Sequence, residues 1–324
     1  MVTTLEKKLK KYLGVKHLFF VSNGTAALEI AIKALGLQKE IITTPFSYVA
    51  TTSSIVWMNC EPVFADIDEN SLCINPDLIQ KKITKNTEAI LATHVYGNPC
   101  RVEAIEKIAE KNKLKVIYDA AHCFGVKYKG TSILNYGDIS TISFHATKLF
   151  HTAEGGAIIT NDDELAHKIS YMRNFGHKGQ EEFWGLGING KNSELHAAMG
   201  LCILPGIKKI INKRRTLTEV YDKYLKHTPL VKIMINENCE YNYSYYPVLF
   251  ESEKQLLETR NVLNKNNIVP RRYFYPSLTE LKYAQSSNLP VSHRASKRVL
   301  CLPLYHELTE GDVKKITELI RNSL

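Results

Sequence analysis

Short apolar runs alternate with amphipathic segments along the first part of the chain. The apolar runs have the length and composition of buried strands and lie at residues 18–21, 41–44, 62–66, 89–93, 116–118, 139–144 and 157–160. Helical periodicity marks residues 5–12, 22–35, 76–83, 102–111, 164–171 and 193–204. Strands that alternate with helices in this way predict a largely parallel sheet with right-handed crossovers.

The pattern changes after Pro205-Gly206, a pair that commonly marks a turn or a boundary. Beyond it we expect helices at 208–225, 253–264 and 312–323 and strands at 245–250 and 268–273. The 324 residues are enough for two units. We therefore predict an α/β fold. Its large domain, residues 1–205, has a mostly parallel mixed sheet flanked by helices, and a small C-terminal α+β domain follows at residues 206–324.

Two charged side chains follow strands of the predicted sheet. Asp119 ends the run at 116–118, and Lys148 stands shortly after the run at 139–144. Ligands of open α/β sheets bind at the carboxyl ends of the strands. A lysine that bonds to a cofactor aldehyde and a carboxylate that pairs with its pyridine nitrogen suit pyridoxal 5'-phosphate. A buried Asp–Lys salt bridge in an ordinary core is the alternative that the spacing leaves open.

Composition narrows the class of protein. The chain is 44% hydrophobic and 23% charged, which is ordinary for a globular enzyme. No apolar run approaches the length of a membrane span, and residues 1–16 lack the apolar core of a signal peptide, so we expect a cytoplasmic protein without membrane contact. The seven cysteines form no CxxC pair, so neither a metal site nor a disulfide framework is predicted.

The net charge of +9 leaves the kind of partner open. Lysine pairs such as Lys7-Lys8 and Lys208-Lys209 fall on amphipathic helices, where they are typical of solvated faces. No nucleic-acid-binding motif accompanies them, and we expect no nucleic-acid partner. A nucleotide-diphosphate substrate would also favour a positive cleft.

Seven segments, in order and spread over most of the chain, resemble the sugar aminotransferases of the DegT type (DegT/DnrJ/StrS), which are fold-type I pyridoxal-phosphate enzymes. The resemblance implies that fold, the cofactor and an amino-transfer reaction. The segments are SNGTAALEIAIKAL (22–35), ITTPFSYVAT (42–51), PVFADID (62–68), HVYGNPC (94–100), VIYDAAHCFGV (116–126), SFHATKLFHTAEGGAIIT (143–160) and GINGKNSELHAAMG (187–200).

The resemblance also implies which residues hold the cofactor. Gly24 and Thr25, at the start of a predicted helix, and the hydroxyl of Ser143 would bind its phosphate, although a plain helix cap also explains the first two. Tyr48 would stack on the ring, with a core or surface aromatic as the alternative. His122 stands where relatives often carry Gln and would contact the ring oxygen.

The glycine-rich loop at 174–192 contains a residue that the resemblance assigns to a neighbouring subunit. Asn189 would reach across a homodimer interface to the partner's cofactor phosphate, so that the active sites are shared; a turn asparagine in GING is the alternative. Many relatives have a basic residue at the position of Lys191, which we place at the substrate.

Four further residues are candidates for binding the substrate. His94 ends a predicted strand and faces the cleft unless it is a core histidine. His145 lies two residues beyond Ser143 and is expected to shape the site. Arg271 and Tyr275 would meet a diphosphate or a sugar, with a solvated charge as the alternative.

The function that the resemblance implies is amino transfer from glutamate to a nucleotide-linked keto-6-deoxy sugar. The sequence around His145, SFHATK, resembles that of enzymes that aminate carbon 4 of dTDP- or UDP-4-keto-6-deoxyglucose, as in viosamine synthesis. Relatives that act at carbon 3 more often have Tyr at this position. Lys148 would be both the covalent anchor and the general acid/base.

Two other classes compete with the aminotransferase. Related enzymes that dehydrate the sugar carry histidine in place of the anchoring lysine, and the presence of Lys148 argues against that class. A truncated, cofactor-binding protein without activity is the other. Relatives usually carry a further N-terminal segment ahead of the helix at 5–12, and substrate binding is expected to depend on it.

Overall fold

The structure, a computed structural model, describes residues 1–284 and 289–324. Its largest sheet has seven strands in the order β1-β9-β8-β5-β4-β2-β3. β9 is antiparallel to both of its neighbours, and the other pairs are parallel. The strands are β1 (His17–Val21), β2 (Glu40–Thr43), β3 (Glu61–Phe64), β4 (Thr87–Thr93), β5 (Lys115–Asp119), β8 (Ile139–Ser143) and β9 (Gly156–Thr160). The predicted α/β fold with a mostly parallel mixed sheet is confirmed.

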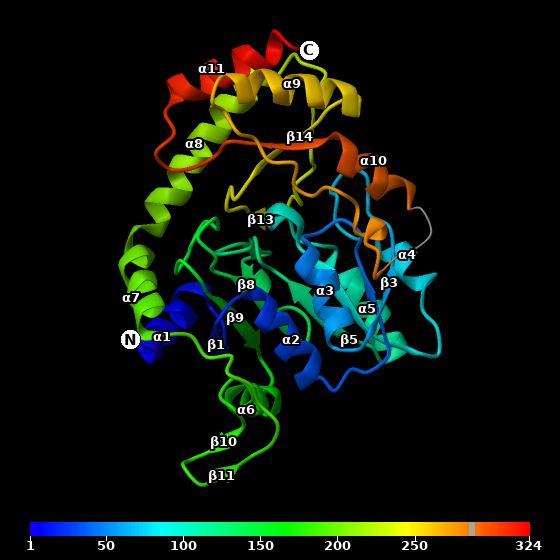
Figure 1. Ribbon diagram of the computed structural model, residues 1–324, viewed down its shortest axis with the longest axis vertical. Coiled ribbons are helices and arrows are strands. Elements are labelled where there is room, and N and C mark those ends of the chain that lie inside the picture. The colour runs from blue at the N-terminus through cyan, green and yellow to red at the C-terminus, as the bar shows by residue number, and fades with distance from the viewer. Residues whose placement is uncertain (285–288) are drawn as a thin grey trace.

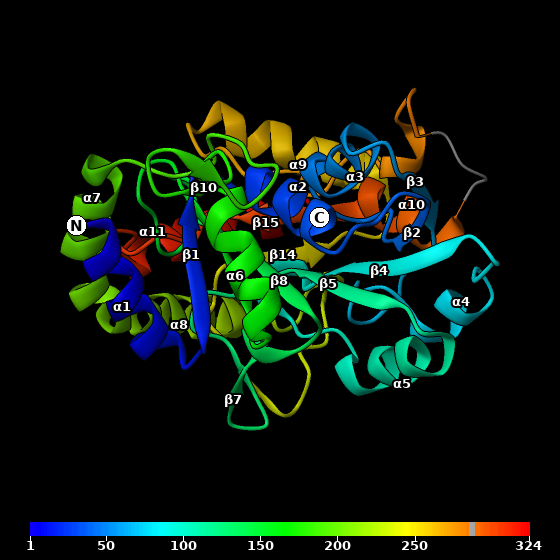
Figure 2. The same cartoon turned by 90° about the horizontal axis from the view of Figure 1, so that it is seen from below.

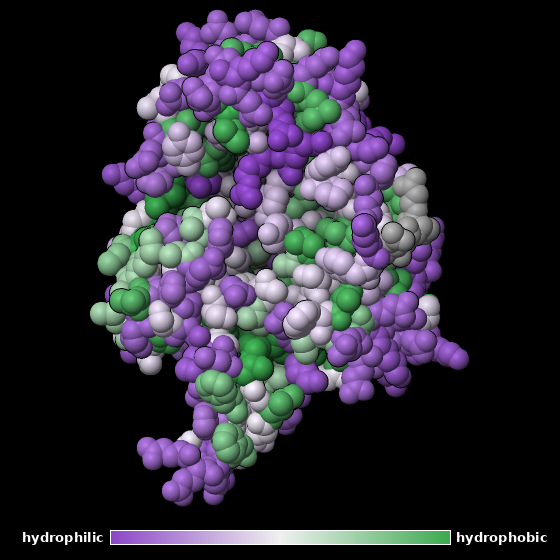
Figure 3. Space-filling model, viewed as in Figure 1, coloured by the Kyte–Doolittle hydropathy of each residue, from purple (hydrophilic) through white to green (hydrophobic). Residues whose placement is uncertain are grey.

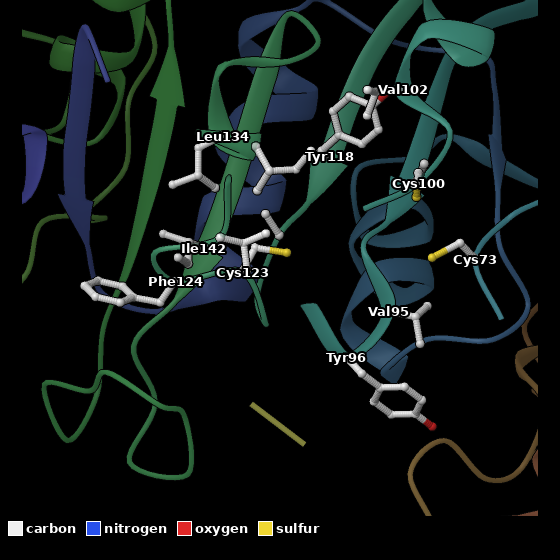
Figure 4. Packing of buried hydrophobic residues seen from close by; sticks show 14 of the residues in the cluster. Cys73, Val95, Tyr96, Cys100, Val102, Tyr118, Cys123, Phe124, Leu134 and Ile142 are labelled. Carbon is white, nitrogen blue, oxygen red and sulfur yellow. The ribbon is translucent and has the colours of Figure 1, made fainter. Parts of the chain in front are cut away.

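Helices cover both faces of this sheet, because successive strand residues point to opposite sides. Ile41 packs in the layer that holds α2, α3 and α6, whereas Ile42 packs in the layer with α1, α4 and α5. Figure 2 shows α2 and α3 on one side of the sheet and α4 and α5 on the other, and Figure 4 shows part of the second layer. The helices are α1 (Val2–Leu13), α2 (Gly24–Ala34), α3 (Val49–Trp57), α4 (Pro76–Gln80), α5 (Val102–Asn112) and α6 (Asp163–Met172).

The sheet and these helices form a large lobe, and a small lobe lies above it in Figure 1. The small lobe has its own buried apolar cluster between three helices and an antiparallel sheet of order β12-β14-β15. Its elements are α8 (Ile207–Leu225), β12 (Val231–Lys232), β14 (Tyr246–Leu249), α9 (Glu253–Lys265), β15 (Val299–Leu302) and α11 (Glu310–Arg321). Placing the domain limit between residues 205 and 206 stays a prediction.

One predicted strand is wrong. Residues 268–273 do not form a strand; Pro270 has no N–H to donate, and only Arg271 makes a bridge, to Cys301 of β15. β14 pairs with β12 and β15, and the apolar pattern revealed neither of these two strands.

Short elements complete the chain. The loop at 174–192 contains a small hairpin, β10 and β11, that projects from the bottom of Figure 1. The remaining elements are β6 (Lys127–Tyr128), β7 (Thr131–Ser132), β10 (His177–Lys178), β11 (Glu182–Phe183), β13 (Cys239–Glu240), α7 (Glu194–Ile203), α10 (Pro290–Arg298) and the 3-10 turns η1 (Val95–Gly97), η2 (Ile133–Asn135), η3 (Leu204–Gly206) and η4 (Leu278–Glu280). No helix within the described ranges is long and apolar enough to cross a membrane.

A buried carboxylate anchors the helix that leads into β15. Asp66, just beyond β3, accepts the backbone N–H groups of Val291 and Ser292 in the first turn of α10, each at 2.9 Å, and that of its own neighbour Ile67 at 2.9 Å. It therefore caps α10 from 225 residues away in sequence.

We expect Asp66→Ala to lower the free energy of unfolding by about 2–4 kcal/mol, because three backbone donors lose a charged acceptor and two of them belong to a helix start. Denaturation in urea measures this. Asp68→Ala is the matched control: among the described residues Asp68 accepts from its own turn, at Asn70 and Ser71, and this variant should lose about 1 kcal/mol. Equal losses in the two variants would contradict the anchoring role.

Candidate active site

A cavity of about 370 Å³ opens where three parallel strands end. β4, β5 and β8 deliver Thr93, Asp119 and Ser143 to its wall, and the first turn of α2 forms another side. We call it the cofactor cavity. Most of the residues predicted for the site line it, namely Gly24, Thr25, Tyr48, Asp119, His122, Ser143, His145, Lys148 and Arg271.

Asp119 is a buried carboxylate held by hydrogen bonds to both of its oxygens. The Thr51 hydroxyl donates to Oδ2 at 2.7 Å, and the Ala121 N–H donates to Oδ1 at 3.1 Å. Ser47 in turn bonds to the hydroxyls of Thr51 and Thr93, at 2.7 and 3.0 Å. Burial raises the pKa of Asp119, while the two donors and the charge of Lys148 oppose the rise. The carboxylate is thus oriented and ready to pair with a cation.

Lys148 follows β8 and lies with its Nζ 5.9 Å from the centre of the Tyr273 ring. Burial and, to a smaller extent, the charge of Arg271 lower the pKa of this amine to about 8, while Asp119 acts in the opposite direction. A lysine in this state has a sizeable neutral fraction near neutral pH. The neutral amine is the form that attacks a carbonyl carbon.

His122 is held as a neutral imidazole. The Tyr96 N–H donates to its Nδ1 at 3.0 Å, so in the neutral ring the proton lies on Nε2. Burial lowers the pKa of His122 well below its usual value, and the charges of Lys148 and Arg271 lower it further. Phe274 stacks on the ring with centroids 5.7 Å apart. His122 therefore offers a fixed N–H donor at the wall of the cavity.

The first turn of α2 forms a cradle of backbone N–H groups. Asn23 caps the helix by accepting from the Ala26 N–H at 2.8 Å, which leaves the N–H groups of Gly24 and Thr25 without an acceptor among the described residues. The backbone packs tightly here, since a Cβ on Gly156 would lie 2.6 Å from the Asn23 carbonyl. Free N–H groups at the start of a helix bind anions such as phosphate.

Several residues of the wall were not predicted from the sequence. Thr51, the partner of Asp119, lies in the first turn of α3, and Ser47 lies four residues earlier in the loop before it; this spacing of two hydroxyl side chains was a usable signal. Tyr273 and Phe274 come from the segment before η4, two and three residues after Arg271, which was predicted for the site. Glu154 also lines the wall, with an oxygen 3.5 Å from Nε2 of His145.

The profile of the DegT/DnrJ/EryC1/StrS aminotransferase family matches residues 1–321. The chain belongs to this family. It is 43% identical over 324 residues to the dTDP-4-amino-4,6-dideoxy-D-glucose transaminase of Shigella dysenteriae, covering 98% of this chain and 88% of that one. It is 31% identical to the GDP-perosamine synthase of Vibrio cholerae, over 99% and 90% of the two chains.

Solved structures of the family have the same fold. DesI, crystallised in the presence of its TDP-sugar product, superposes with a TM-score of 0.94 over 99% of this chain and 84% of that one, at 31% identity. The chain is therefore a pyridoxal-phosphate-dependent aminotransferase with the fold of this family, as predicted.

The residues of the cofactor cavity fit the cofactor that the family uses. An oriented carboxylate, a lysine of lowered pKa and a helix start with free N–H groups border one space of about 370 Å³. These are the partners that a pyridine nitrogen, an aldehyde and a phosphate require. The assignment of individual residues to these three groups stays a prediction.

Four predicted residues do not line the cavity. His94 is fully buried: its Nδ1 accepts the Cys100 N–H at 3.0 Å, and its ring stacks on Tyr118 at 4.5 Å, so it is the core histidine of the alternative interpretation. The Tyr275 ring stacks instead under the Arg272 guanidinium, at 3.5 Å. The other two, Asn189 and Lys191, are exposed on the loop beside β1 and bond to one another.

We expect the amine of Lys148 to titrate near pH 8 in the protein without cofactor, which competitive acetylation followed by mass spectrometry of its peptide would measure as a function of pH. Two variants test the cause. Asp119→Asn removes the charge that raises the pKa of Lys148 and should shift the midpoint to lower pH, whereas Arg271→Gln should shift it to higher pH. Shifts of the opposite sign would show that neither charge acts on Lys148 as described.

Proposed function

We propose that this enzyme transfers the amino group of glutamate to carbon 4 of a nucleotide-linked 4-keto-6-deoxyglucose, with dTDP or UDP as the nucleotide. The observation that carries the proposal is the 43% identity, over 98% of the chain, to a protein named dTDP-4-amino-4,6-dideoxy-D-glucose transaminase. The cavity agrees with it chemically, because it combines a lysine base with an oriented carboxylate.

When bound, pyridoxal phosphate supplies an electron sink for the electrons released as a proton leaves the substrate carbon. In the proposal, Asp119 keeps the proton on the ring nitrogen, and Thr51 and Ala121 keep the carboxylate in the required orientation. Gly24 and Thr25 bind the phosphate through their free N–H groups. These residues act through fixed positions, so they need no rearrangement during the reaction.

The proton transfers fall to Lys148 in this proposal. Lys148 would anchor the cofactor, and as a free amine its Nζ would take up and release the proton that moves during amino transfer. A pKa near 8 suits both directions near neutral pH. His122, which carries its proton on Nε2, would donate a hydrogen bond to the ring oxygen, and Tyr48 would stack on the ring.

The proposal places a second copy of the chain at the site. Asn189 and Lys191 lie outside the cavity of their own chain, on the loop that carries the projecting hairpin. Apolar side chains gather at the base of this projection in Figure 3, and exposed members of the segment include Phe183, Trp184 and Leu186. Such an apolar surface supports an interface between copies, with each loop serving the partner's cavity. A cytoplasmic location stays a prediction.

We expect Lys148→Ala to lower kcat/KM for amino transfer by at least about a thousandfold, equivalent to about 4 kcal/mol, because it removes the base. The assay incubates the enzyme with glutamate and dTDP-4-keto-6-deoxyglucose and identifies the product by NMR. A product from the corresponding 3-keto-6-deoxyglucose nucleotide, together with no product from the 4-keto sugar, would replace the carbon 4 assignment by the carbon 3 alternative. Lys127→Ala, an exposed lysine paired with Glu240, is the matched control and should retain activity.

Mixing two inactive variants tests the shared site. If Asn189 serves the partner, Lys148→Ala and Asn189→Ala chains should regain activity when they are mixed, because one of the two sites in a mixed dimer is then intact. Sedimentation velocity gives the oligomeric state in parallel. A monomer, or a dimer whose mixture stays as inactive as its components, would rule out this arrangement.

A further inference from the structure

A second cleft of about 510 Å³ lies against the small lobe, beside the cofactor cavity. Two residues, Thr147 and Arg271, line both spaces. Thr147 directly precedes Lys148 in the sequence, so the second cleft lies next to the lysine. Its other walls come from α8, α11, the segment after α9 and the end of β15. The chemistry described so far makes no use of it.

A buried guanidinium lines this cleft. Arg214 of α8 is only 8% exposed, and its Nη1 donates to the Ser244 carbonyl at 2.9 Å. Its Nε is buried and has no hydrogen-bond partner among the described residues, and no described carboxylate forms an ion pair with it. Burial lowers the pKa of Arg214 to about 10, so the side chain stays charged at neutral pH. A buried cation without a counter-charge is unfavourable unless a ligand supplies one.

A second unused donor lies on the same wall. The hydroxyl of Tyr245 is buried and has no partner in the described part of the chain. Arg271 and Lys315 add two further positive charges to the lining. The one carboxylate among the described lining residues, Asp312, already accepts both the N–H and the hydroxyl of Thr309. The residues that line the cleft therefore include two with unpaired buried donors, and they carry an excess of positive charge.

We propose that the second cleft binds an anionic oxygen group of one of the enzyme's substrates, with Arg214 and Tyr245 as its hydrogen-bond donors. The Nε edge of a guanidinium matches the two oxygens of a carboxylate or a phosphate. Since the cleft adjoins the cofactor cavity, a ligand held there by one end has its other end near Lys148. The identity of the ligand rests on the proposed function: it is either the far carboxylate of the amino donor or the diphosphate of the sugar.

Calorimetric titration of the purified holoenzyme distinguishes these two sources. Glutarate is an unreactive dicarboxylate that represents the donor, and dTDP represents the diphosphate. We expect Arg214→Gln to weaken binding of one probe about tenfold or more and Tyr245→Phe to weaken the same probe about threefold. Arg215→Gln is the matched control, since this neighbour on α8 is exposed and paired with Glu219, and it should change affinity less than twofold.

Each outcome decides the question. Loss for glutarate assigns the cleft to the donor, and loss for dTDP assigns it to the diphosphate. The proposal is overturned if Arg214→Gln and Tyr245→Phe both leave the affinities unchanged. If circular dichroism shows that Arg214→Gln does not fold, the Tyr245→Phe variant, which lacks only one oxygen, decides alone. The amino-transfer assay distinguishes failure of the cleft proposal from failure of the proposed function. If the wild type is active but its ligand binding does not change when Arg214 is replaced, only the cleft proposal is refuted. If the wild type binds the probes but transfers no amino group, the proposed reaction is refuted.

Discussion

The active site depends on keeping a carboxylate and an amine together in a largely buried space. Burial works against the charged form of both Asp119 and Lys148, and each charge partly restores the other. The balance leaves the amine with a pKa of about 8, which a solvated lysine does not have. The sheet makes this possible, because the parallel neighbours β4, β5 and β8 end at one edge and fix the spacing of the residues that come after them in the chain.

The layers around the site serve to hold these groups in one orientation. Thr51 in α3 and Ser47 in the loop before it connect Asp119 to β4 through hydrogen bonds. The segment ahead of β14 holds the backbone of His122, because the Asn242 amide and the Ser244 hydroxyl both donate to the His122 carbonyl, at 2.8 and 2.9 Å. Because the small lobe contributes this segment, the two lobes must pack correctly before His122 presents its Nε2 proton to the cavity.

The sequence predicted those parts of the site that depend on strand ends, and it missed those that depend on packing between distant segments. Asp119 and Lys148 follow apolar runs whose parallel pairing brings their ends together, so their meeting was predictable. His94 also follows a strand but does not reach the cavity, because the chain after β4 turns into the core and the imidazole stacks on Tyr118. Tyr273 reaches the cavity from the segment at 268–273, where the apolar pattern suggested a strand but the structure has only a bridge at Arg271.

One short segment connects the cofactor cavity to the second cleft. The Ser244 carbonyl accepts from Arg214, and its hydroxyl donates to the His122 carbonyl. A substitution at Arg214 therefore acts in two ways: it removes a donor from the cleft, and it loosens the segment that orients His122. Loss of activity alone would not separate these effects, because both lower the rate. Binding measured with Tyr245→Phe does separate them, since this substitution removes a donor from the cleft and leaves both hydrogen bonds of Ser244 in place.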